Sequence, residues 1–169
     1  LQTERGGFAG FVQRERTKPV IAAVDGPALA GGTEIVLACD MVIATTNATF
    51  GIPEVKRSLV AAAGGLFRLP KKIPANIAME LALTGDPITA ERAHHFGLVN
   101  ELCEPGTALD RGIALAERIE ANAPLAVRET RKLVLRYEEL SVDEGIHESN
   151  KALMGLTQTA DFSEGLMAF

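Results

Sequence analysis

Two glycines and a glutamate, Gly31, Gly32 and Glu34, form the segment of this sequence most able to do chemistry. They end a loop at the start of an expected helix, where the first backbone amides have no partner within the helix and stabilise negative charge. Glu34 follows Gly31 by three positions, so its carboxylate is expected on the face from which the Gly31 amide projects. An oxyanion donor and an acid/base group would then share one side of a pocket. The alternative is a tight strand-to-helix turn in which Glu34 is an ordinary first-turn acid.

A second glutamate, Glu54, lies 20 positions after Glu34 and directly follows Pro53. Because proline fixes the backbone in a rigid turn, the Glu54 side chain is expected to be aimed in one direction. Two converging glutamates can divide the work of proton donor and proton acceptor. The alternative is an acid that only belongs to a turn. Downstream, Ala61–Gly65 is similar to another helix entry with exposed amides, or to a site of close helix packing.

Other reactive side chains are weaker candidates. Ser58 and Thr33 have no partner histidine at a recognisable spacing, so a Ser/His/Asp hydrolase is not indicated. His94 and His95 stand late in an expected helix, where a cation favours the helix dipole. The basic run 68–72 could meet phosphates, but a solvated connecting loop also explains it. The sequence contains no Walker-type or dinucleotide-type glycine pattern.

The elements that must position these residues are a strand, a helix and a second strand. Val20–Val24 and Met41–Thr45 are short apolar runs typical of buried strands, the first ended by a turn at Asp25–Pro27, and Thr49–Gly51 is a possible third strand. A helical pattern over Gly31–Cys39 lies between the first two. This order predicts a βαβ crossover with parallel strands.

The second half of the chain, after a boundary near Leu69–Pro70, is expected to be mainly helical. We interpret residues 1–169 as a single domain, with a sheet-bearing core over 1–70 and a helical part over 71–169. Cap residues and apolar spacing predict helices over Ile73–Leu83, Ala90–Phe96 with Thr89 as cap, Gly106–Ala121, Pro124–Tyr137 and Ser141–Thr157, and an extended segment over Val99–Leu102.

Composition narrows the classes of function. The chain has 169 residues, 47% of them hydrophobic, and a formal net charge of −5, which fits a folded domain with a sizeable core. Acidic and basic residues are mixed, so nucleic acid is not expected as a partner, and no apolar run is long enough to span a membrane. Only Cys39 and Cys103 are present, in no metal-ligand spacing. We therefore expect no metal site, no disulfide framework and a reducing, cytoplasmic location.

Three motifs of this chain strongly resemble those of the enoyl-CoA hydratase/isomerase family, the crotonases. The first lies at Lys18–Glu34, the second at Phe50–Glu54 and Gly64–Pro70, and the third at Leu83–Ala93 and Gly97–Asn100. The resemblance implies an α/β crotonase fold, a spiral core of ββα units with a helical C-terminal part. Because the family's earlier motif and its basic C-terminal end are not found, we expect a chain truncated at both ends.

The resemblance also implies a reaction. Crotonases bind acyl-CoA thioesters between two backbone amides, and Gly31 matches the position of one of them. In the hydratases of this family two glutamates activate the water that adds to the double bond, and these match Glu34 and Glu54. We therefore expect reversible hydration of 2-enoyl-CoA, as in fatty acid metabolism, with no cofactor because coenzyme A is part of the substrate. A homotrimer or hexamer without membrane partners is expected.

Some positions depart from the family pattern. Ala61 and Ala62 replace a proline and a glycine, and Ser58 replaces a common glycine. Because these positions line the acyl side of the pocket in relatives, other outcomes stay open. They are an enoyl-CoA isomerase, a carnitinyl-CoA dehydratase-like enzyme, a thioester hydrolase, or a non-catalytic acyl-CoA-binding subunit.

Overall fold

The computed structural model describes residues 1–159 and Phe162, and its chain divides into two compact units. One unit contains residues 1–15 and 20–114, and the other contains residues 16–19 and 115–169. The first unit carries both glutamates singled out above. The single domain over residues 1–169 stays a prediction. The expected boundary at Leu69–Pro70 is not a break in structure, because Pro70 lies inside a helix and two short strands follow it.

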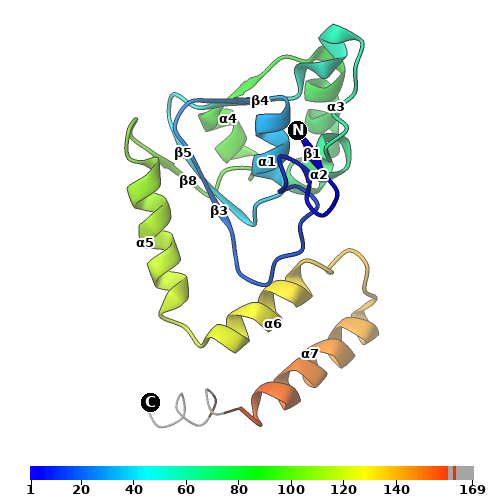
Figure 1. Ribbon diagram of the computed structural model, residues 1–169, viewed down its shortest axis with the longest axis vertical. Helices are drawn as coiled ribbons and strands as arrows, with labels where there is room; N and C mark the ends of the chain where they lie inside the picture. The colour runs from blue at the N-terminus through cyan, green and yellow to red at the C-terminus, as the bar shows by residue number, and fades with distance from the viewer. Residues whose placement is uncertain (160–161, 163–169) are drawn as a thin grey trace. The chain divides into compact units, whose positions relative to one another are not determined.

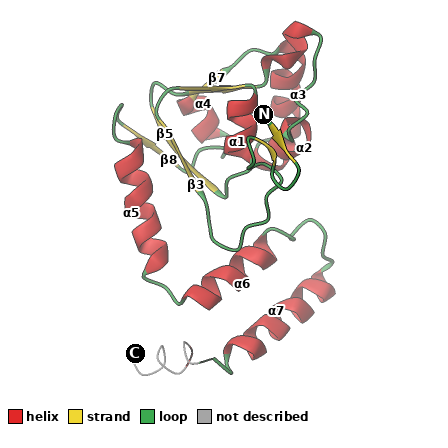
Figure 2. Ribbon diagram, in the orientation of Figure 1, coloured by secondary structure: helices red, strands yellow, loops and turns green. Residues whose placement is uncertain are grey.

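The predicted βαβ crossover is confirmed. Strands β3 (Ile21–Val24), β5 (Met41–Thr45) and β8 (Glu101–Cys103) form a parallel sheet with β5 in the centre (Figures 1 and 2). Ile43 and Ala44 of β5 are wholly buried. A strand covered on both faces reads as a continuous apolar run, which is why this strand could be located from the sequence.

A second sheet contains β4 (Pro27–Leu29), β6 (Thr49–Gly51) and β7 (Ile88–Thr89). β4 is parallel to β6, and β7 is antiparallel to it. The sequence had indicated only a turn at Asp25–Pro27, so β4 is a correction. Pro27 is tolerated here because it is the first residue of a strand at the edge of the sheet, where no ladder hydrogen bond from its nitrogen is needed.

Helices of the first unit pack in sequence order. α1 (Gly31–Leu37) contacts β4 and α2 (Gly65–Lys72), and α2 contacts α3 (Ala75–Thr84), which reaches the 3₁₀ helix at Pro53–Arg57 (Figure 1). The sequence had indicated α2 only through the glycines at its start. The 3₁₀ helix that carries Glu54 is thus connected through α3 and α2 to the helix that carries Glu34.

The remaining helices agree with the predicted ones to within a few residues at each end. Thr89 caps α4 by accepting from the Arg92 amide, and Ser141 caps α7 in a reciprocal pair with Glu144. Their bounds are Ala90–His95 for α4, Ala108–Glu120 for α5, Pro124–Val134 for α6 and Val142–Leu156 for α7. α6 and α7 pack against each other in the second unit.

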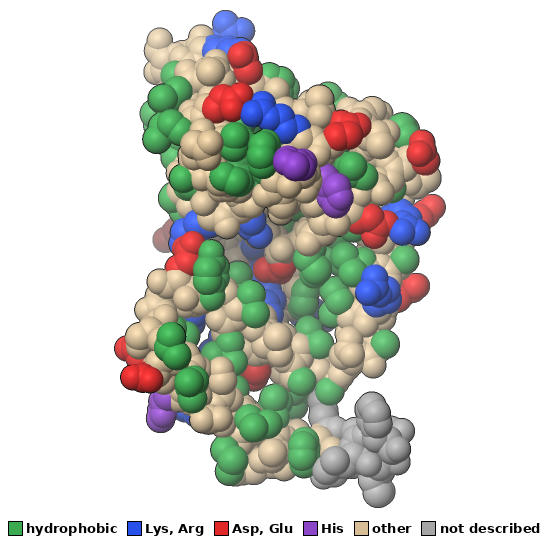
Figure 3. All heavy atoms as spheres, turned by 180° about the vertical axis from the view of Figure 1, so that it is seen from behind, with side chains coloured by type: hydrophobic (Ala, Val, Ile, Leu, Met, Phe, Trp, Pro, Cys, Tyr) green, Lys and Arg blue, Asp and Glu red, His purple; other side chains and the backbone are tan. Residues whose placement is uncertain are grey.

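The core of the first unit lies between the sheets and α1 to α4. Phe50, Leu69, Leu81 and Val99 are among its most buried side chains. A short antiparallel hairpin, β1 (Gln2–Thr3) with β2 (Gly7–Phe8), precedes it and was not predicted. Acidic and basic side chains are interspersed on the face drawn in Figure 3, as expected for a chain without a basic stripe.

Ser58 adopts a left-handed conformation, φ 57° and ψ 33°, at the end of the 3₁₀ helix. This conformation costs a non-glycine residue about 1–2 kcal/mol, a cost that the glycine implied here by the family resemblance would avoid. We expect Ser58→Gly to raise the free energy of unfolding by up to about 1 kcal/mol, after allowing for the greater freedom of glycine in the unfolded chain. Urea denaturation followed by circular dichroism measures this change.

Ser149, which is exposed in the middle of α7, provides the matched control. There Ser149→Gly should lower the free energy of unfolding by about 0.5–1 kcal/mol, because glycine is a poor helix former. Equal effects of the two substitutions would show that the Ser58 backbone carries no strain.

Candidate active site

The turn before α1 holds the Gly31 amide in a strained and fixed position. Ala30 has φ 53° and ψ −125°, a backbone conformation that residues other than glycine rarely adopt. Its own groups are both bonded, because its N–H donates to the Gly51 carbonyl at 2.9 Å and its carbonyl accepts from the Glu34 amide at 3.1 Å. Within the described part of the chain, the Gly31 N–H itself has no hydrogen-bond acceptor. An unpaired amide at a helix start is suited to bind an anion or a polarised carbonyl oxygen.

Thr33 fixes this turn to the neighbouring strand. Its buried hydroxyl lies 2.5 Å from the Ala28 carbonyl oxygen and 2.8 Å from that of Gly51, and it accepts from the Gly51 amide at 2.9 Å. The sequence had argued against Thr33 as a nucleophile. The structure gives its hydroxyl a different task, because it joins the two sides of the β4–β6 pair where α1 begins.

Glu34 is almost completely buried, with 3% of its surface exposed. Its Oε1 accepts a hydrogen bond from the Gly65 amide at 2.9 Å, at the first residue of α2. A side chain at position 65 would not fit, because its Cβ would stand 2.9 Å from the Ala61 Cβ and 3.2 Å from the Glu34 Oε1. The amide at the N-terminus of α2 therefore holds the Glu34 carboxylate, and only glycine can bring it so close.

Glu54 lies in the first turn of the 3₁₀ helix, and its Oε2 is buried without a hydrogen-bond partner among the described residues. Burial raises the pKa of the Glu54 carboxyl above its ordinary value; a hydrogen bond with its own backbone lowers it, and the negative charge of Glu34 raises it. The two carboxyl groups are thus near enough to influence each other. A buried carboxyl oxygen without a partner is typical of a site that takes up water or substrate.

Arg68 is a residue whose importance the sequence did not reveal. Its Nη1 donates to the Ala63 carbonyl at 3.0 Å and its Nη2 to the Val12 carbonyl at 2.6 Å. Gly64, with φ 113°, makes room for this guanidinium, since a Cβ there would stand 1.9 Å from Nη1. The basic run was interpreted as a solvated loop or a phosphate contact. Its first arginine instead joins the start of α2 to the N-terminal segment.

His94 agrees with its predicted structural role, since it lies in the last turn of α4 and its Nδ1 is 2.8 Å from the Val99 carbonyl oxygen. Among the described residues, no group of three or more His, Cys, Asp and Glu side chains could hold a metal ion. No helix in that part of the chain is long and apolar enough to cross a membrane.

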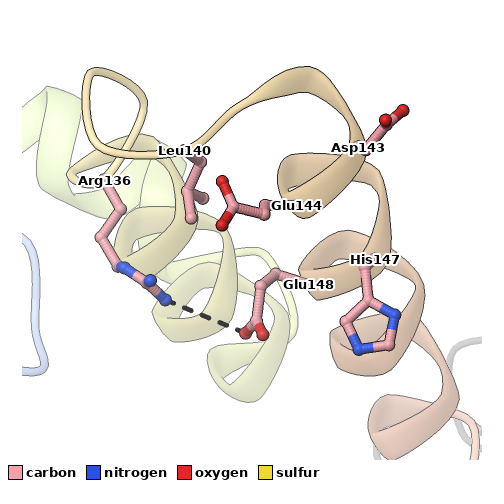
Figure 4. A pocket seen from close by; sticks show the side chains of 6 residues that line it. All are labelled: Arg136, Leu140, Asp143, Glu144, His147 and Glu148. Atoms are coloured by element: carbon pink, nitrogen blue, oxygen red, sulfur yellow. Dashed lines mark ion pairs between the residues drawn. The ribbon is translucent and has the colours of Figure 1, made fainter.

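The second unit has a shallow pocket beside α7, but it contains none of the candidate residues. Figure 4 shows Arg136 reaching toward Glu148, with 3.9 Å between Nη1 and Oε2, while His147 points elsewhere. Glu144 is already used there as the partner of Ser141. Arg136, Glu144 and Glu148 of this pocket thus pair with neighbouring groups of the same unit.

The chain is similar to enzymes that act on CoA thioesters. A family model for enoyl-CoA hydratase/isomerase matches residues 13–169. Over 90% of the chain it is 42% identical to (E)-benzylidenesuccinyl-CoA hydratase of Thauera aromatica, and over 97% it is 37% identical to carnitinyl-CoA dehydratase of Salmonella arizonae. It spans 59% and 65% of the length of these two relatives.

A solved structure shows the same family likeness. The crystal structure of enoyl-CoA hydratase from Mycobacterium tuberculosis H37Rv shares 55% sequence identity and a TM-score of 0.95, over 99% of this chain and 66% of that one. The expected crotonase fold is therefore confirmed for the part that this chain spans, about two thirds of such a structure. The chain belongs to the enoyl-CoA hydratase/isomerase family, the crotonases.

Proposed function

We propose that the protein adds water reversibly to 2-enoyl-CoA thioesters and so forms 3-hydroxyacyl-CoA. One observation carries this proposal. A buried glutamate held by a backbone amide, Glu34, lies near a second glutamate of raised pKa, Glu54. Two neighbouring carboxyl groups in unlike environments are suited to act as one base and one acid.

In this reaction the thioester oxygen would accept a hydrogen bond from the Gly31 amide. Negative charge develops on that oxygen when water attacks C3, and an unpaired amide at a helix start stabilises it. The free Gly31 N–H and its rigid support by Ala30 and Thr33 favour this role. The family resemblance implies that a second backbone amide binds the same oxygen.

The two glutamates would have different roles. Glu34, whose Oε1 is held by the Gly65 amide, would take a proton from water as the hydroxyl adds to C3. Glu54, whose pKa is raised by burial, would give a proton to C2. The proton that Glu34 takes from water then passes to Glu54 and replaces the one given to C2, so one hydroxyl at C3 and one proton at C2 are added, the atoms of one water molecule. The reverse sequence removes water.

Apolar side chains on α7 support the expected assembly of several copies. Val142, Ile146 and Leu153 follow one face of the helix at spacings of four and seven, and each is more than half exposed. Charged helices of small domains seldom leave such a stripe in water. We propose that another copy of the chain covers it.

Glu34→Gln and Glu54→Gln should each lower the turnover number for crotonyl-CoA by roughly 10²–10⁴-fold, the usual contribution of a positioned acid or base. The measurement is the loss of the enoyl absorbance, made on the longest natural protein that contains these 169 residues. Glu148→Gln, at a half-buried glutamate of α7, is the control and should leave turnover unchanged. Unchanged turnover in both glutamate variants would contradict the proposed function.

The titration of Glu54 can be followed by carbon NMR of labelled carboxyl groups. Glu54 should bind its proton up to a higher pH than an exposed glutamate does, and Glu34→Gln should lower its pKa because a neighbouring negative charge is removed. As pH rises through the raised pKa, the proton is lost and hydration should slow. A Glu54 signal that titrates with the exposed glutamates would contradict this assignment.

Gly65→Ala should displace the Glu34 carboxylate, because the new Cβ would press on both Ala61 and Glu34. A misplacement of about 1 Å can cost on the order of 10²-fold in rate. We therefore expect a fall of that order in kcat with a KM that changes less than about threefold. Gly145→Ala is the control, since a Cβ at that position of α7 would meet no other part of the described chain within 4 Å and turnover should not change. A rise in KM alone would show that Gly65 serves binding.

A further inference from the structure

The ring of Phe8 occupies the space beside Gly31 that a side chain there would fill. A Cβ built on Gly31 would stand 2.4 Å from the Phe8 Cζ and 2.5 Å from its Cε1. The far edge of the ring is therefore in contact with the Gly31 Cα. Phe8 itself is half-buried, and the proposed function does not use it.

The segment around Phe8 is held in place by its own backbone. Gly7 and Ala9, on either side of Phe8, both have positive φ, 65° and 55°. The Phe8 carbonyl accepts from the amides of Phe11 at 3.0 Å and Val12 at 3.3 Å. Positive-φ residues on both sides and two accepted hydrogen bonds thus fix the backbone at Phe8.

Arg68 connects this segment to the start of α2. Its guanidinium donates to the Val12 carbonyl and to the Ala63 carbonyl, two residues before the Gly65 amide that holds Glu34. The position of the Phe8 ring is thus coupled to the same helix terminus that positions the carboxylate. An arginine that joins two carbonyls in this way stabilises one geometry.

The position of the ring has a consequence for the acyl group. A carbonyl oxygen bonded to the Gly31 N–H lies about 2.9 Å from that nitrogen, so the thioester carbon and its substituents come close to the Gly31 Cα. One of these substituents is sulfur in every CoA thioester. The other is C2 of the acyl group, where the bulk differs from one substrate to another.

We propose that Phe8 is a specificity-determining residue that excludes acyl groups branched at C2, and that Arg68 is its positioning residue. This inference rests on the proposed function, because it takes the Gly31 amide as the partner of the thioester oxygen. The substrate class is thereby narrowed to 2-enoyl-CoA thioesters with an unbranched C2.

The test compares binding of butyryl-CoA and isobutyryl-CoA, which differ by branching at C2 and cannot be hydrated. Isothermal titration calorimetry on the longest natural protein that contains this chain gives the ratio of the two dissociation constants. Phe8→Ala should shift that ratio about tenfold toward isobutyryl-CoA, the effect of room for one methyl group. Phe8→Leu should shift the ratio less but in the same direction, and this variant provides the test if the alanine variant does not fold. Arg68→Gln should also shift it in that direction.

Phe96→Ala is the matched control, since Phe96 is a half-buried phenylalanine of the same unit at the end of α4. Its ratio should equal that of the unchanged protein. A ratio unchanged within twofold in folded Phe8 variants would overturn the role of Phe8 and leave the proposed function standing. Failure of the unchanged protein to bind either thioester would instead overturn the proposed function, and the role of Phe8 with it.

Discussion

The hydrogen bond from the Gly65 amide to the Glu34 carboxylate is the interaction on which the rest of the site depends. Glu34 is 3% exposed, and burying a carboxyl group without a partner would cost several kcal/mol. The amide at the start of α2 provides that partner at 2.9 Å. The same bond joins α1 to α2, so one interaction satisfies a buried polar group and aligns the two helices around it.

Close packing makes this bond possible. A Cβ at position 65 would collide with Ala61, and a Cβ at position 64 would collide with Arg68. The pair of glycines thus has two separate tasks, one toward Glu34 and one toward the arginine that reaches the N-terminal segment. The alternative interpretation of these glycines, close packing against a neighbouring helix, is therefore correct, and the Gly65 amide is buried and bonded to Glu34 rather than exposed.

The backbone is also strained at Ala30, next to the amide whose direction matters. Ala30 stays in an unfavourable conformation because its N–H and its carbonyl are both bonded and because Thr33 holds the neighbouring strand. Strain of this kind costs about 1–3 kcal/mol, which the surrounding hydrogen bonds must offset. The result is a Gly31 amide whose direction is set by its neighbours before any ligand arrives.

Sequence by itself determined the elements whose pattern is local. The apolar run of β5, the Thr89 and Ser141 caps and the glycine-led start of α1 are each decided within a few residues, so they could be located without coordinates. The motifs around Glu34 and Glu54 likewise led to the family and to the crotonase fold.

Only the tertiary structure decided how distant segments meet. The bond between Glu34 and Gly65 crosses 31 positions, and that between Arg68 and Val12 crosses 56. Phe8 reaches Gly31 from a hairpin that the sequence did not predict. No periodicity or cap signal encodes such pairs, because they arise from the packing of whole elements and from the space that a missing Cβ leaves at a few glycines.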